Sequence, residues 1–156
     1  MSGLKYRPDM DAARKRLTTW WNGGDIGRPA MQVYAPRDKP IEKIPEMPRP
    51  DGWITGYSTS NFDYRVNLGA RACINQHYLG EAVPAVAPDL APNCLALFLG
   101  CKGVETPDSV WCEPFLHDPD EVALDFRKDN FYWDFSFRLG KEFLRIGKGK
   151  FLIQFP

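Results

Sequence analysis

The chain has 156 residues, of which 44% are hydrophobic and 26% are charged, and its formal net charge is zero. This composition is typical of a globular domain, and the balanced charge excludes neither enzyme nor binding protein but gives no reason to expect nucleic acid or a membrane surface as partner. No apolar run reaches the ~18 residues of a transmembrane helix, and the first residues lack the apolar centre of a signal peptide. We therefore expect a cytoplasmic protein whose four cysteines are free thiols.

The first helix is predicted to begin at Pro8 and to end at the glycine pair 23–24. Proline suits the first turn of a helix, and the acidic residues that follow it suit the positive end of the helix dipole. Apolar residues recur at helical spacing on one face: Met10, Ala13, Leu17, Trp20 and Trp21. We expect this face, with its two tryptophans, to cover the base of the core.

The next segments are predicted to alternate between strands and a helix. A short strand at 30–35 leads into an extended, proline-rich loop at 36–60. A helix follows over 62–78, with Asn61 as its N-cap, and a buried strand at 82–87 ends before Pro88. Within that helix Cys73 and His77 have the spacing of two metal ligands, but two ligands do not make a site, so a structural role is favoured.

The second half of the chain is predicted to contain more helix than strand. We expect a short helix at 91–99, a hairpin that pairs 102–105 with 109–113, a short helix at 119–126, a long helix at 129–146 and an apolar strand at 151–155. Strands that alternate with helices are typical of an α/β fold with a mainly parallel sheet. Three such strands cannot close a barrel or cover both faces of their sheet, which favours a single partial domain over 1–156; a small complete α/β domain is the alternative.

The best candidates for ligand contact are the polar side chains that follow the predicted strands, because ligands bind at the carboxyl ends of parallel strands. Tyr34 and Arg37 follow the first strand, where Arg37 would either grip a substrate carboxylate or form a salt bridge within the loop. Asp89 and Asn93 follow the second, where Asp89 would bind a cation, pass a proton or cap the next helix. Gln154 is a polar residue inside the last strand, and it either faces an interior or marks a sheet edge.

Four segments, in order, resemble the amino-terminal part of the uroporphyrinogen decarboxylase family. They read WWNGGDIGRPAMQVYAP at 20–36, YLGEAVPAVAPDLAPNCLALFLGC at 78–101, DSVWCEPFLHDPDEV at 108–122 and KEFLRIGKGKFLIQFP at 141–156. The family also includes methyltransferases that use methylcobamides. This resemblance implies the amino-terminal part of a (β/α)8 TIM-type barrel, truncated near its third or fourth strand.

The same resemblance favours the methyltransferase branch over the decarboxylases. In the decarboxylases two arginines after the first strand bind substrate carboxylates, whereas Tyr34 stands at the first of these positions and Arg37 lies one residue short of the second. The family's aspartate after the second strand corresponds to the zone from Asp89 to Asn93. The methyltransferases use zinc and a corrinoid, and the resemblance places the zinc ligands outside this chain, so we expect no metal or cofactor in it and no activity from it alone.

The implied partners are a small-molecule substrate or a corrinoid protein. A second hypothesis is not enzymatic. A chain with unpaired strands could instead be a binding fragment that pairs its exposed sheet with a partner chain or with a second copy of itself.

Overall fold

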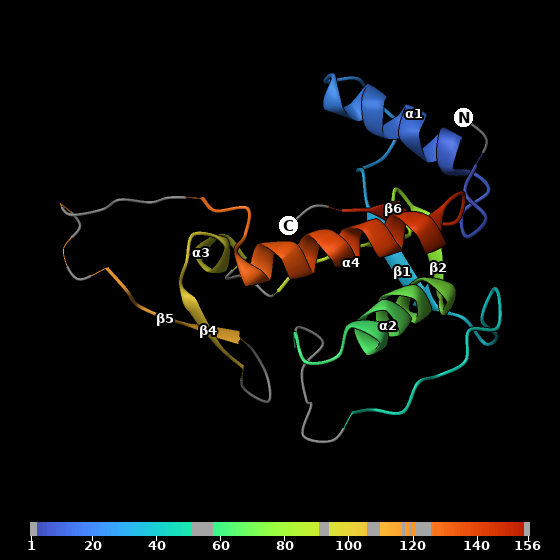
Figure 1. Ribbon diagram of the computed structural model, residues 1–156. Coiled ribbons are helices and arrows are strands. Elements are labelled where there is room, and N and C mark those ends of the chain that lie inside the picture. The colour runs from blue at the N-terminus through green and yellow to red at the C-terminus, as the bar shows by residue number, and fades with distance from the viewer. Residues whose placement is uncertain are drawn as a thin grey trace.

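The computed structural model describes residues 3–50, 58–90, 94–105, 110–116, 118, 120 and 126–154. The elements along the described chain are α1 (Met10–Trp21), β1 (Gln32–Pro36), α2 (Phe62–Ile74), β2 (Gln76–Gly80), β3 (Ala85–Val86), α3 (Cys94–Phe98), β4 (Lys102–Glu105), β5 (Val110–Glu113), α4 (Phe131–Gly147) and β6 (Leu152–Ile153). The long helix α4 runs through the middle of the molecule, with α2 on one side of it, α3 and the β4–β5 hairpin near its start, and α1 at the periphery (Figure 1).

Local capping signals fix where two of the helices begin. The side chain of Asn61 accepts a hydrogen bond from the main-chain nitrogen of Tyr64 at 2.9 Å, as predicted for the start of α2. Asn130 does the same at the start of α4, where it accepts from Tyr132 and Trp133. The predicted helices at 62–78 and 129–146 are thus confirmed at their beginnings, and α4 is confirmed along its whole length.

The end of α2 differs from the prediction, because the helix stops at Ile74 and the chain turns directly into β2. Tyr78 points inward from this strand, and its hydroxyl donates to the main-chain oxygen of Cys73 at 2.9 Å. His77 therefore lies on a strand, and it does not share a helical face with Cys73. The interpretation of these two residues as a helical pair of metal ligands is ruled out.

The strands form three separate two-stranded sheets within the described residues. β1 and β2 are antiparallel, with Tyr34 opposite Tyr78, and β4 and β5 form the predicted antiparallel hairpin. β3 and β6 are parallel, with Ala85 opposite Leu152. The turn of the hairpin at 106–109 and most of the predicted helix at 119–126 lie outside the described residues.

The predicted fold class, the amino-terminal part of a (β/α)8 TIM-type barrel, is wrong for this structure. A barrel requires the first strand to pair in parallel with the strand at 82–87, but β1 pairs in antiparallel with β2 instead. Gly80 has a φ of +60°, and the main-chain nitrogen of its neighbour Glu81 donates to the main-chain oxygen of Met31. The pairing of β1 with β2 therefore ends at this point, before β3 begins. The described chain is a small mixed α/β fold with three short sheets.

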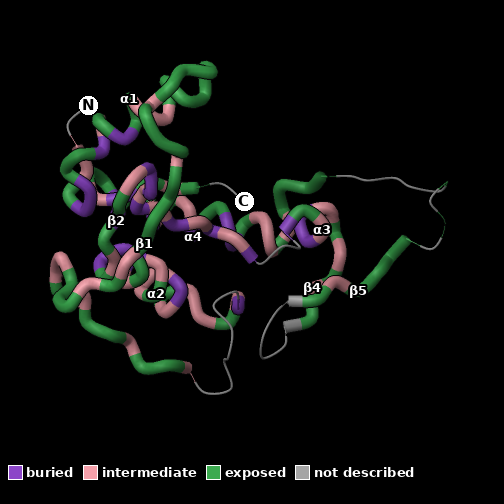
Figure 2. The backbone as a smooth tube through the Cα atoms, turned by 180° about the vertical axis from the view of Figure 1, so that it is seen from behind, coloured by how far each residue is buried: buried purple, intermediate pink, exposed green. Residues whose placement is uncertain are grey.

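The core lies between α4 and α2, where Figure 2 shows buried residues on both helices, and it also includes side chains of β3 and α3. One face of α4 supplies its buried aromatic and aliphatic side chains, Phe135, Leu139 and Phe143. The predicted apolar face of α1 is covered only at its start, where Met10 and Ala13 are buried. Trp21 is 81% exposed, so the expectation that the tryptophans cover the base of the core is wrong.

Two further sequence expectations concern connections and membranes. The described part of the loop predicted over 36–60 comprises residues 36–50 and 58–60. Pro36 is the last residue of β1, and the remainder contains no helix or strand. Across the described chain, no helix has both the length and the apolar character needed to cross a bilayer.

Candidate functional site

Tyr34 lies on β1 and is half exposed. Its ring meets that of Tyr78 edge-on, with 5.9 Å between centroids and 81° between planes, and its hydroxyl donates to Oε1 of Gln32 at 3.1 Å. The antiparallel register places these two tyrosines directly opposite each other, so the pairing of β1 with β2 fixes where the Tyr34 hydroxyl stands.

A polar hollow of about 450 Å³, which we call the Tyr34 hollow, opens beside this ring. It lies between the β1–β2 sheet and the β3–β6 sheet. Its lining residues are Gln32, Tyr34, Ala72, Cys73, Gln76, Tyr78, Val83, Ala85, Leu152, Ile153 and Gln154. The predicted candidate Gln154 therefore meets Tyr34 at one site, although the two residues are far apart in sequence.

Arg37 does not line this hollow. Its Nε donates to the main-chain oxygen of Gln76 at 2.8 Å, and its own main-chain nitrogen donates to Asn75 at 2.8 Å. Both bonds fasten the end of β1 to the start of β2. The sequence suggested either a substrate clamp or a salt bridge within the loop for Arg37, and the structure instead gives its guanidinium a main-chain acceptor.

Asp89 lies away from the Tyr34 hollow, between β3 and α3. Its main-chain oxygen accepts a hydrogen bond of 2.7 Å from Arg65, a buried arginine that also donates to the main-chain oxygen of Ser58 at 3.0 Å. Asn93, the fourth predicted site residue, lies outside the described residues. The structure thus brings Tyr34 and Gln154 together but does not bring Arg37 or Asp89 to the same hollow.

Two side chains of the hollow, Cys73 and Tyr78, are held in their neutral forms. Burial raises the pKa of the Cys73 thiol to about 11, and burial also raises the pKa of Tyr78 well above its usual range. Neither group exchanges a proton readily near neutral pH. The hollow is consequently suited to binding by hydrogen bonds from amides and phenols, and not to thiolate or general base chemistry by these two groups.

A buried carboxylate, Glu81, is a feature that the sequence analysis missed. Its side chain is 1% exposed and receives Arg16 at 2.7 Å and Arg28 at 2.6 Å, and it also accepts the main-chain nitrogen of Met31 at 3.0 Å. The hydrogen bonds from Arg28 and Arg16 hold the pKa of Glu81 well below its usual range. This cluster ties α1 and the segment before β1 to the end of β2. The available signal in the sequence was the position of Glu81 directly before the apolar segment 82–87. An acid in such a segment is expected to be buried, and a buried carboxylate requires a cation as partner.

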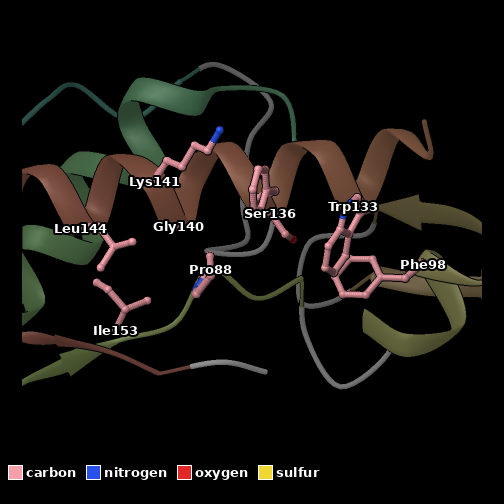
Figure 3. Close-up of a pocket in the computed structure, with 9 residues that line it drawn as sticks. Pro88, Phe98, Trp133, Ser136, Gly140, Lys141, Leu144 and Ile153 are labelled. Atoms are coloured by element: carbon pink, nitrogen blue, oxygen red, sulfur yellow. The ribbon is translucent and has the colours of Figure 1, made fainter. Parts of the chain in front are cut away.

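A second, apolar cavity of about 120 Å³ lies against α4 (Figure 3), and we call it the Ser136 pocket. Its lining residues are Pro88, Phe98, Trp133, Ser136, Phe137, Gly140, Lys141, Leu144 and Ile153. Ile153 borders both this pocket and the Tyr34 hollow, so β6 separates the two.

Comparison with known proteins gives no relative: no family model, no curated protein and no solved structure matches the chain. Among the described residues, no three histidine, cysteine or acidic side chains lie close enough together to hold a metal ion. The two sites above therefore have to be interpreted from their own geometry.

Proposed function

We propose that the chain is part of an enzyme of the uroporphyrinogen decarboxylase family, from its methyl-transfer branch, and that the Tyr34 hollow forms one wall of the substrate site. The four sequence segments that resemble the family, and that occur in the same order as in the family, support this assignment. A small molecule or a corrinoid protein is the proposed partner.

One observation supports the branch: among the described residues, no charged side chain lines the Tyr34 hollow. A substrate with several carboxylates needs cations, preferably arginines that bind each carboxylate through two hydrogen bonds. Arg37, the arginine nearest to Tyr34 in the sequence, donates instead to the main-chain oxygen of Gln76. The amides of Gln32 and Gln154 and the Tyr34 phenol instead suit an uncharged part of a substrate, which they would orient by hydrogen bonds.

In the methyl-transfer branch, zinc supplies the chemistry by holding a thiol as its thiolate for attack on a methyl group. The described residues do not fit such an ion, because no set of three ligands lies together in them. We therefore assign no catalytic step to this chain. Its proposed contribution is to bind and orient the substrate, and we expect it to have no turnover alone.

Calorimetric titration of the full chain with methylcobalamin and, separately, with uroporphyrin tests this proposal. We expect saturable binding of methylcobalamin that weakens about five-fold in Tyr34→Phe, the loss of one hydrogen bond. Val33→Ala is the matched control, because Val33 is on the same strand but points to the opposite face and does not line the hollow. Tight binding of uroporphyrin, or no binding of methylcobalamin, would contradict the proposal.

A second candidate function is strand pairing with another chain. β3 and β6 form a parallel sheet of only two strands in the described residues, and Leu152 on β6 is 40% exposed. Parallel sheets are usually covered on both faces and flanked by further strands. If the chain functions by pairing through this sheet, light scattering will show self-association that Leu152→Lys abolishes. A chain that stays monomeric at all concentrations would favour the enzymatic proposal.

A further inference from the structure

Ser136 is a buried polar residue in the middle of α4, and within the described part of the chain its hydroxyl has no hydrogen-bond partner. The residue is 5% exposed, and its Oγ is one of two buried side-chain polar atoms in the described structure that lack a partner. A helical serine usually donates to the main-chain oxygen one turn earlier, but Ser136 does not. Leaving a buried hydroxyl unpaired is unfavourable, so its location calls for an explanation.

The Ser136 hydroxyl lies at the wall of an apolar cavity. Figure 3 shows its side chain beneath α4, on the side of Pro88 and Trp133. The pocket residues of α4 recur at intervals of three or four, from Trp133 through Gly140 to Leu144, on a different stripe from the core residues. α4 thus has two largely apolar stripes, one that packs in the core and one that lines the Ser136 pocket. The Ser136 Oγ is the unpaired polar atom on the second stripe.

Glycine at position 140 keeps this cavity open. A Cβ built there would lie 3.5 Å from Cγ of Pro88, which is ordinary contact distance, so a methyl group fits but takes up space in the pocket. Glycine is unfavourable in the interior of a helix compared with alanine. Gly140 does not have a positive φ, so the backbone conformation of α4 does not require a glycine at this position.

We infer that the Ser136 pocket binds a small, uncharged aromatic molecule that carries one hydroxyl or carbonyl group, and that this group pairs with the Ser136 hydroxyl. This site is distinct from the Tyr34 hollow and does not depend on the function proposed for it. The volume of about 120 Å³ is close to that of engineered apolar cavities of ~150 Å³, which hold benzene.

The lining of the pocket explains the chemistry of this ligand. Trp133 and Phe98 meet edge-on, at 5.3 Å between centroids and 88° between planes, and they provide aromatic walls for a ring. Among the described residues, Lys141 is the one charged residue of the lining, and its ammonium lies 4.5 Å from the centre of the Phe137 ring, where a cation–π contact holds it. An uncharged ligand therefore fits better than an anion.

A small molecule fits this surface better than a protein partner does. The unpaired hydroxyl lies at the wall of a cavity beside a glycine, whereas a helix or strand from another chain would cover the exposed rim residues Phe137 and Leu144 and leave the hydroxyl unpaired. A second copy of the chain remains the competing occupant, and the experiment includes it.

The test compares 4-methylphenol with toluene, which has the same ring and methyl group but no hydroxyl. Both are titrated into the full chain by calorimetry and by ligand-observed NMR. We expect both to bind saturably, with 4-methylphenol about five-fold tighter because of one additional hydrogen bond. Ser136→Ala should remove that preference and leave the affinity for toluene unchanged, Ser136→Thr should retain it, and Gly140→Ala should weaken both ligands.

Lys148→Ala, an exposed site just after α4, serves as the control that should change neither affinity. Thermal unfolding of each variant establishes that it is folded. Absence of saturable binding by wild type, or equal preference in wild type and Ser136→Ala, would overturn the inference. So would a dimer, detected by light scattering, that Leu144→Lys dissociates, because that result would make the pocket an interface between copies of the chain.

Discussion

Replacing Glu42 by glutamine removes the carboxylate at which three distant segments of the chain meet. Oε1 of Glu42 accepts the Tyr6 hydroxyl at 2.7 Å and the Lys150 ammonium at 2.8 Å, and Oε2 accepts the Lys5 ammonium. These bonds join the proline-rich connection after β1 to the segment before α1 and to the turn between α4 and β6. We expect Glu42→Gln to destabilise the fold in a manner that depends on pH.

The size of the effect follows from the pKa of Glu42, which the hydrogen bonds from Lys150 and Lys5 lower from 4.5 to about 2. A shift of this size corresponds to about 3 kcal/mol, at 1.36 kcal/mol per pKa unit. The Lys5 and Lys150 side chains are 51% and 34% exposed, so solvent screens the interaction. We therefore expect about 1.5 to 2 kcal/mol at neutral pH.

The sign of the pH dependence is fixed because the folded pKa is the lower one. The stabilisation by Glu42 is complete above the pKa of the unfolded chain, about 4.5, and it is lost as the pH falls through the folded value of about 2. The difference in stability between wild type and Glu42→Gln should therefore shrink by more than half between about pH 7 and about pH 3.

Urea unfolding followed by circular dichroism measures this difference at both pH values. Glu46→Gln is the matched control, because Glu46 is 77% exposed and its ion pair with Arg71 is at the surface. That variant should lose less than about 1 kcal/mol. A gap between wild type and Glu42→Gln that is equal at the two pH values, or no larger than that of the control, would refute the reasoning.

The remaining predictions concern two glycines and two cysteines. Gly140→Ala should raise the stability to urea by about 0.5 to 1 kcal/mol, since alanine favours the helix and its Cβ fits. Gly69→Ala should instead lower it by about 1 kcal/mol or more, because its Cβ would lie 2.6 Å from the ring of buried Phe143; equal effects would show that packing does not decide the sign. The Cys101 and Cys112 thiols are partly exposed, and Cys101 is close enough to Cys112 to contribute to the raised pKa of the Cys112 thiol. Oxidised glutathione should link them into a disulfide while it is itself reduced to two thiols, and mass spectrometry of tryptic peptides detects the linkage; because burial raises the pKa of Cys112, the reaction should be faster at higher pH.

The elements predicted correctly from sequence are those with local signals at their ends. Asn61 marks the start of α2 through a side-chain cap, and the positive φ of Gly23 and Gly149 follows the ends of α1 and α4. The β4–β5 hairpin pairs segments only a few residues apart. In each case the interaction that decides the structure lies within a few residues of the element, so a single sequence contains it.

The predictions failed where distant residues decide the structure. Residues 76–78 continued the helical spacing of α2, but residues 76–80 pair as β2 with β1, which lies forty or more residues earlier. With this antiparallel partner, β1 is not part of the all-parallel sheet expected for a barrel. The same pairing places Tyr34 beside a hollow and turns Arg37 toward the main chain of Gln76, so position along the sequence was informative but side-chain orientation was not.

The contacts of the arginines also depend on residues that are distant in the sequence. A guanidinium has five donors, and a buried one must find acceptors. Arg7 and Arg16 both donate to the main-chain oxygen of Gly80, and Arg16 and Arg28 neutralise Glu81. These arginines stabilise the turn that leads out of β2, and no cation is among the described residues that line the Tyr34 hollow. Selectivity there consequently depends on amides and a phenol, and recruiting Arg16 or Arg28 to a carboxylate-rich ligand would break a buried ion pair of Glu81, at a cost of several kcal/mol.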